Sequence, residues 1–340
     1  MARSGYRITT EDASKLTDDE VLVGLKLFNR FEQEVWPQDP VTQTEDALAE
    51  HRSHPERMRR TLFNAWSSNA RLAGSVELAI DPDDDDNPDV LGCAIYVDPD
   101  HRRKGIGADL LEQVIEFARS ENRQRLVGST FSQVPAGELF AADAGAEAKS
   151  WSRKNHLPMA EIDRDLMETW VRQGPERAPG YELLAWNGPV PEEHLDAFVR
   201  LMLVMNDAPR DDLEINDFTL TPAEFREGEA RGVAVGQQTW RLVARRSSDG
   251  ELVGLHELSW VPAFPEVMWV GSTGVRPEDR GHALGKWLKV AMMLRVLDES
   301  PEIADIRTEN ANSNDAMLGI NNEMGYRELL AVTTWELKVP

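Results

Sequence analysis

The chain has 340 residues, 41% of them hydrophobic and 29% charged, which is ordinary for a soluble globular protein with packed cores. Its length suggests two domains. The 60 acidic residues outnumber the 37 basic ones, and the net charge is -23. This balance disfavours a protein that binds nucleic acid or anionic membranes nonspecifically, because such surfaces need an excess of lysine and arginine.

The single cysteine, Cys93, excludes an intramolecular disulfide and a metal site built from several cysteines. No histidine spacing indicates a metal site either. The sequence contains no stretch of about 20 apolar residues that could span a membrane, and its N-terminus lacks the apolar core of a signal peptide. We therefore expect a cytoplasmic protein.

In the first half, the pattern predicts an amphipathic helix over 20–36 and an antiparallel hairpin over 60–80. The apolar run 91–97 is typical of a strand, and a helix and a second strand are expected over 108–122 and 125–131. A strand, a glycine-containing turn, a helix and a strand form a βαβ unit, which implies a pair of parallel strands.

The second half repeats this order. A helix is expected over 192–206, a hairpin over 239–260, and the strand–turn–helix–strand segment over 267–309. The segment between the halves contains a further expected helix within 158–174.

The two halves also share residues at one fixed spacing. Each of four residues in the first copy lies 178 positions before its match: Val97, Pro99, Arg102 and Gly107 match Val275, Pro277, Arg280 and Gly285. Such an internal repeat predicts two similar domains. We place the N-terminal domain at 1–158, a linker at 159–180 and the C-terminal domain at 181–340.

The turn after the repeated strand has the composition of an anion site. Arg102–Gly107 precedes a helix, whose first N–H groups are free and whose dipole favours a negative charge. The P-loop pattern is absent, and Leu110 stands where a Rossmann motif would have its third glycine. The turn therefore indicates either a phosphate or pyrophosphate site of another kind or a capped helix after a tight turn.

The pattern Val-x-Pro-x-x-Arg-x-x-Gly-x-Gly resembles the acetyl-CoA motif of the GNAT N-acetyltransferase superfamily. The first copy matches it fully, whereas the second has Ala283 for the middle glycine and Gly281 two residues before it. The asparagine-containing segment 308–317 and the later Met324–Tyr326 are similar to the family's last helix and its Gly-aromatic end. The whole chain thus resembles a tandem GNAT protein, an arrangement shared with mycothiol synthase and related actinobacterial acetyltransferases.

The resemblance implies an α/β (α+β) fold of two GNAT domains, each a mixed, mostly antiparallel sheet with a splayed parallel strand pair flanked by helices. It implies acetyl-CoA as co-substrate and no metal. The implied cofactor contacts come from both turns and from the asparagine segment: Val97, Arg102, Arg103, Lys104, Gly105, Ile106, Gly107, Ala108, Val275, Arg280, Gly281, His282, Ala283, Leu284, Gly285, Lys286, Asn310 and Asn314.

The catalytic groups implied by the resemblance lie in the second half. A carboxylate usually removes the proton of the amine, and Glu257 and Glu266 are the acidic candidates near the repeated strand. The family's tyrosine acid is replaced by Asn321 in the second half and by Ala141 in the first, and Asn321 remains able to donate a hydrogen bond to sulfur. Because the asparagine segment occurs only in the second half, we expect catalysis there.

The sequence therefore predicts an acetyl-CoA-dependent N-acetyltransferase acting on a primary amine of a small molecule in a ternary complex. The acidic charge favours a cationic acceptor. Two alternatives remain: a mycothiol-synthase-like reaction on a cysteinyl pseudodisaccharide, and a non-catalytic acyl-CoA sensor. The repeat is compatible with a monomer or a homodimer.

Overall fold

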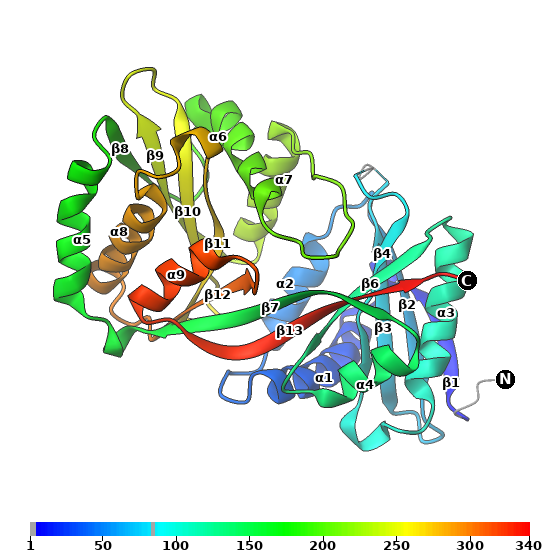
Figure 1. Ribbon diagram of the computed structural model, residues 1–340. Helices are drawn as coiled ribbons and strands as arrows, with labels where there is room; N and C mark the ends of the chain where they lie inside the picture. The colour runs from blue at the N-terminus through cyan, green and yellow to red at the C-terminus, as the bar shows by residue number, and fades with distance from the viewer. Residues whose placement is uncertain (1–4, 83–85) are drawn as a thin grey trace. The chain divides into compact units, whose positions relative to one another are not determined.

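The computed structural model describes residues 5–82 and 86–340, which fall into two compact units. Unit 1 comprises Met1–Trp151, Asp211–Asn216 and Leu330–Pro340, and unit 2 comprises Ser152–Arg210 and Asp217–Leu329. Each unit has one parallel strand pair, β-strands that otherwise pair antiparallel, and helices around them (Figure 1). The predicted α/β fold class is confirmed.

Unit 1 is built around a four-stranded antiparallel sheet in the order β1-β2-β3-β5 and a second group in which β4 pairs with β6 and β6 with β13. Its helices α1 and α3 cover opposite faces of the four-stranded sheet: Tyr96 contacts α1, whereas Gly74, which points to the other face, approaches α3. Its elements are β1 (Arg7–Asp12), α1 (Asp18–Val35), α2 (Thr44–Ser53), β2 (Arg59–Trp66), β3 (Leu72–Ile80), β4 (Val90–Gly92), β5 (Ile95–Val97), α3 (Ile106–Ser120), β6 (Arg125–Phe131) and α4 (Pro135–Asp143).

Unit 2 has a sheet in the order β7-β12-β11-β10-β9-β8, in which only β11 and β12 are parallel. Helices α8 and α6 pack on β10. The elements are β7 (Glu147–Pro158), α5 (Arg164–Arg177), β8 (Tyr181–Asn187), α6 (Leu195–Met202), α7 (Pro222–Ala234), β9 (Gln238–Arg246), β10 (Leu252–Trp260), β11 (Val267–Val275), α8 (Leu284–Glu299), β12 (Asp305–Ala311) and α9 (Asp315–Met324). The final strand, β13 (Arg327–Lys338), belongs to unit 1 from Leu330 onwards.

The last strand of each half is exchanged. Strand β13, at the end of the second half, pairs antiparallel with β6 in unit 1, from Val332 opposite Phe131 to Lys338 opposite Arg125. Strand β7, which ends the first half, pairs with β12 in unit 2 (Figure 1). The compact units therefore differ from the contiguous halves 1–158 and 181–340, because each sheet takes its final strand from the other half.

The segment 159–180, expected as a linker, is instead part of unit 2. It forms α5, which packs against α8. The reason is the apolar face of this helix: Met167 is buried, and Trp170 and Val171 pack against the core around α8.

Candidate functional site

The candidate site of unit 1 is the cleft where the repeated strand leaves β6. The run 91–97, expected as one strand, is divided in two. Strand β4 pairs with β6 as far as Gly92 opposite Val127, and the N–H of Cys93 then donates to the carbonyl of Val127. Beyond this bond the chain turns to β3, and β5 pairs with that strand. The parallel pair is therefore splayed after Cys93, as the resemblance implied.

Gly128 permits this geometry. A Cβ atom at this position would lie 2.6 Å from the carbonyl oxygen of Cys93, closer than two such atoms can approach. The close contact keeps the two backbones together at the closed end of the cleft. Burial raises the pKa of the Cys93 thiol to about 11, so this thiol stays protonated at neutral pH and is no nucleophile.

The cleft-facing edge of β5 carries free backbone groups. The N–H of Asp98 donates to the carbonyl of Ala73 on β3. Since bonding groups alternate along a strand, Ile95 and Val97 must direct their N–H and C=O groups into the cleft. The carbonyl of Val97 already accepts from Nε of Arg102 at 3.2 Å. The N–H of Val97 and both backbone groups of Ile95 thus face the cleft and are available to a ligand there.

The turn that follows β5 forms an N–H cradle. Arg103 and Gly105 both have left-handed backbones, with φ of 60° and 85°, and α3 begins at Ile106. The first N–H groups of a helix have no intrahelical acceptor and favour an anion. Helix α3 is fixed behind them by Ile106, Leu110 and Val114, which are buried at helical spacing.

Arg102 has a structural role in this turn. Its guanidinium donates to both oxygens of Glu34 on α1, at 2.9 and 2.5 Å, which occupies the side chain. Lys104 donates to the carbonyl of Asp100 at 2.9 Å. Arg103 and Lys104 are exposed and supply positive charge beside the cradle, together with the backbone of Gly105, Ile106, Gly107 and Ala108.

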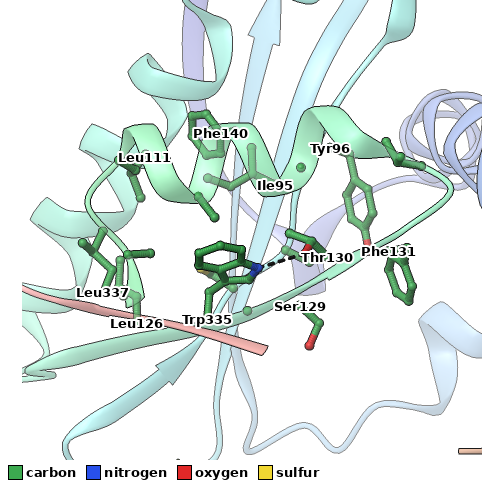
Figure 2. Close-up of a pocket in the computed structure, with 18 of the residues that line it drawn as sticks. Ile95, Tyr96, Leu111, Leu126, Ser129, Thr130, Phe131, Phe140, Trp335 and Leu337 are labelled. Carbon is green, nitrogen blue, oxygen red and sulfur yellow. Dashed lines mark hydrogen bonds between the residues drawn. The ribbon is translucent and has the colours of Figure 1, made fainter. Parts of the chain in front are cut away.

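A cavity of about 170 Å³ occupies the cleft. Its walls are mainly apolar and come from β5, β6, α3, α4 and β13 (Figure 2). Trp335 lies between Leu126 and Leu337 on one side and Thr130 on the other, and its indole N–H donates to Oγ1 of Thr130 at 2.8 Å (Figure 2). Helix α4 contributes the small residues Gly137 and Ala141 and the ring of Phe140 to this wall.

Glu77 lies beside the closed end of the cleft, on the face of the sheet that α1 covers. Its neighbour Val76 pairs with Ile95, and Ser75 pairs with Tyr96, so Glu77 shares the face of Tyr96. Nε of Arg60 donates to its carboxylate at 2.6 Å, while 37% of the Glu77 side chain stays exposed. Glu77 was not among the residues expected from the sequence, although Glu77-Leu78 repeats Glu257-Leu258.

The turn of unit 2 has the same architecture. Gly281 and Ala283 have φ of 85° and 57°, at the places of Arg103 and Gly105, and α8 begins at Leu284. Arg280 donates to the carbonyl of Val275 and to Asp207, as Arg102 does to Val97 and Glu34. The loss of the middle glycine is thus tolerated, because Ala283 adopts the left-handed backbone itself.

Side chains at this second turn are engaged with their neighbours. Lys286 pairs with Glu323 at 2.5 Å, and its ammonium lies 3.3 Å from the ring centroid of Trp170. The ring of His282 lies against that of Tyr181. Gly285, the second residue of α8, has no atom closer than 3.9 Å to the place of a Cβ.

The cleft of unit 2 contains a chain of polar side chains. Nζ of Lys289, fully buried, donates to Oδ1 of Asn321 at 2.6 Å, and Nδ2 of Asn321 donates to Oδ1 of Asn310 at 2.7 Å. At the repeat spacing these three residues correspond to Leu111, Ala141 and Thr130, which line the cavity of unit 1. The polar side chains therefore span the space that is open in unit 1.

These contacts change the interpretation of the asparagine segment. Asn321 is 1% exposed, and its side-chain amide is bonded on both sides, to Lys289 and to Asn310. Asn314 caps α9 by accepting from the N–H of Met317. The pattern that favoured the second half is thus engaged in holding the core of unit 2 together.

The two predicted carboxylates of unit 2 are in different environments. Glu257 is buried, and Oε1 accepts from Nε of Arg241 at 2.6 Å. It lies beside the β11 bulge, with Oε2 3.7 Å from the place of a Cβ on Gly271. Glu266 is exposed and precedes β11, and its backbone carbonyl accepts from Ala304 and Asp305.

The environment of Lys289 predicts a pH-dependent stability. Burial lowers the pKa of its ammonium to about 7, with His256, Asn321, Tyr326 and Met317 as polar or aromatic neighbours. In the unfolded chain this lysine keeps its proton up to pH ~10.5. Between pH 7 and 10.5 the unfolded state therefore binds one proton more than the folded state, and the free energy of unfolding of the wild type rises with pH.

We expect Lys289→Met to be more stable than the wild type at pH 7, with a difference that narrows towards pH 10. Urea unfolding of both proteins at several pH values measures this. The exposed Lys26→Met on α1 serves as the control. A stability difference that stays constant between pH 7 and 10 would contradict the lowered pKa of Lys289.

Among the described residues, 5–82 and 86–340, no group of histidine, cysteine and carboxylate side chains has the arrangement of a metal site. Over the same part of the chain, no helix combines the length and the apolar character needed to cross a membrane.

Comparison with known proteins agrees with this geometry. Residues 24–145 match the family described as acetyltransferase (GNAT) family. The chain therefore contains a GNAT acetyltransferase domain over these residues, and the match covers β5, the turn after it and β6 of unit 1.

Particular relatives extend the likeness over both units. A mycothiol acetyltransferase from Sanguibacter keddieii is 27% identical over 236 residues, 66% of this chain and 68% of its own. A tandem GNAT protein from the clavulanic acid biosynthesis pathway has a TM-score of 0.77 at 23% identity, over 98% of this chain and 99% of its own. A GCN5-related N-acetyltransferase from Sphaerobacter thermophilus has a TM-score of 0.67 at 13% identity, over 98% and 96%. The structural likenesses show the tandem GNAT fold.

Proposed function

We propose that the protein transfers the acetyl group of acetyl-CoA directly to a primary amine of a small, cationic acceptor, in a ternary complex at the cleft of unit 1. The observation that carries the proposal is the apolar cavity at the splayed strands, with an N–H cradle at its open end. We place the reaction in unit 1, although the asparagine pattern favoured the second half, because Lys289, Asn321 and Asn310 span the corresponding space there.

The residues of unit 1 suit the successive parts of acetyl-CoA. The backbone N–H groups at 103–108 face an incoming pyrophosphate, and Arg103 and Lys104 add charge. The N–H of Val97 and the carbonyl of Ile95 pair with the pantetheine amides, and the apolar walls exclude water around the thioester. Acetyl-CoA supplies the activated acyl group.

The groups beside the closed end of the unit 1 cleft can carry out the proton transfer and polarise the thioester. Glu77 accepts the proton of the acceptor ammonium, directly or through a water molecule, which frees the nitrogen lone pair. The N–H of Ile95 is directed into the cleft near its closed end and polarises the thioester carbonyl. A new C–N bond replaces the C–S bond, and CoA leaves as a thiolate without a side-chain acid, because thiols ionise near pKa ~8.5. The thiolate then takes the second proton that the amine nitrogen releases.

The acceptor side of the cleft suits a cation. Phe28 and Phe31 of α1 contact the ring of Tyr96 edge-on, with centroids 5.9 and 4.9 Å away. Burial, and then the nearby carboxylates of Glu32 and Glu77, raise the pKa of Tyr96 to about 12. Aromatic faces and carboxylates together recognise ammonium groups.

A mycothiol-synthase-like reaction on a cysteinyl pseudodisaccharide is the second candidate. It is favoured by the relative named mycothiol acetyltransferase, which matches 66% of this chain. The two candidates share the cleft, the cofactor and the base, and they differ in the acceptor alone.

Thiol release from acetyl-CoA tests the function. We expect release that depends on an added amine, at least about tenfold above the rate without one. The acceptor panel contains polyamines, aminoglycoside-like amines, neutral amino sugars and the cysteinyl pseudodisaccharide. Binding of acetyl-CoA without release on any amine would instead indicate a sensor, and a folded chain that binds no acetyl-CoA would refute both interpretations.

A further inference from the structure

The closed end of the unit 1 cleft is formed by a residue from the far end of the chain. The cleft begins at Gly128, directly after the last pair of β4 and β6. Strand β13 places Trp335 opposite Gly128 in register. Side chains of directly paired residues share a face, so the indole covers the position where Gly128 has no side chain.

Several contacts hold the indole in one place. Its N–H donates to Thr130 at 2.8 Å, and Thr130 is itself packed against Gly137 of α4. Figure 2 shows the ring between two groups of apolar side chains, with Leu111, Leu126 and Leu337 on one side and Thr130 and Phe131 on the other. Because these contacts fix the indole, the ring limits the depth of the cleft at this end.

An acyl-CoA whose pyrophosphate lies on the N–H cradle would bring its acyl end to the indole of Trp335. The cradle follows β5 at the open end of the cleft, and Trp335 lies at the level of Gly128, where the strands meet. The pantetheine arm spans the distance between them, so the thioester and its acyl group come last, against the indole. The leucine side chains beyond it give that end an apolar lining.

We propose that Trp335 sets the length of the acyl group that the cleft accepts, and limits it to short chains. The inference rests on the proposed function, because it assumes that acyl-CoA enters this cleft from the cradle. The exchanged strand thereby acquires a functional role, because the last strand of the second half supplies a specificity-determining residue for the site in the first.

Calorimetric titration with CoA, acetyl-CoA and hexanoyl-CoA tests this without a known acceptor. We expect the wild type to bind hexanoyl-CoA at least about tenfold more weakly than acetyl-CoA, since extra methylenes that do not fit a pocket are rejected by such factors. In Trp335→Ala the ratio of the two dissociation constants should fall by about tenfold or reverse. Trp335→Phe should lie between the two.

Free CoA is the internal control, because it lacks the acyl group and should bind the wild type and Trp335→Ala alike. Thr130→Val removes the hydrogen bond of the indole and keeps the ring, so it should change the ratio less than Trp335→Ala does. If Trp335→Ala fails to fold, Trp335→Phe and Trp335→Leu replace it. An unchanged ratio with normal CoA binding would overturn the inference alone, whereas a wild type that binds no CoA would overturn the proposed function as well.

Discussion

Glu77→Gln is expected to lower kcat for amine acetylation by about 100-fold or more, because a positioned general base contributes that much. The amide keeps the shape of the side chain and its bond to Arg60, but it cannot accept the proton of the acceptor ammonium. The dissociation constant for acetyl-CoA should stay the same, since Glu77 lies on the α1 face and outside the N–H cradle. Steady-state kinetics and calorimetry measure the two quantities separately.

The matched control for this substitution is Glu257→Gln. Glu257 occupies the same place in unit 2, 180 positions later, and also bonds an arginine, Arg241. We expect this variant to lose stability, because it breaks a buried ion pair, and to keep its kcat. If Glu257→Gln lost the activity and Glu77→Gln kept it, the reaction would belong to unit 2.

Gly107→Glu is expected to weaken acetyl-CoA binding by more than about 100-fold, which corresponds to about 2.7 kcal/mol. The substitution places a carboxylate among the N–H groups that would hold the pyrophosphate. Its Cβ would also lie 3.0 Å from the ring of Phe140, which lines the cavity. Calorimetry on the folded variant gives the affinity, and its thermal midpoint verifies the fold.

Gly285→Glu is the control, because Gly285 lies at the equivalent position in unit 2, where the nearest atoms to a Cβ are 3.9 Å away. This variant should bind acetyl-CoA as the wild type does. Loss of binding in Gly285→Glu alone would move the cofactor to unit 2 and agree with the expectation from the sequence.

The repeat and the turn could be predicted because they depend on local chemistry. Glycine, proline and arginine have conformational and hydrogen-bonding preferences that act within a few residues, so Val97–Gly107 and Val275–Gly285 indicate the same strand, turn and helix. The structure adds that Arg102 and Arg280 tie the turn to its strand, through the carbonyls of Val97 and Val275.

The strand exchange could not be predicted in the same way. Strands β7 and β13 have similar sequence patterns. Local preferences would allow either of them to pair with β6 or with β12. Their partners depend on long-range packing, such as that of Trp335 over Gly128. Sequence periodicity carries no information about which half supplies the final strand.

Which half of the chain is the better candidate for the reaction depends on side chains whose environment is set by tertiary contacts. Lys289 lies in the same helix as Lys286, and only the structure shows that Lys289 is buried and bonded to Asn321. Glu77 was within reach of the sequence, because Gly74-Ser-Val-Glu77-Leu and Gly254-Leu-His-Glu257-Leu are aligned at a spacing of 180. The repeat thus extends beyond the turn into the preceding strand, where it pairs the two carboxylates.

A crystal structure of the full chain grown with CoA tests the central claim most directly, since the claim concerns where the cofactor lies. The account predicts CoA in unit 1, with its pyrophosphate on the N–H groups of 103–108, its amides along Ile95 and Val97, and its thiol end near Trp335. CoA bound only at 281–286 of unit 2, with Lys289 displaced from Asn321, would contradict it.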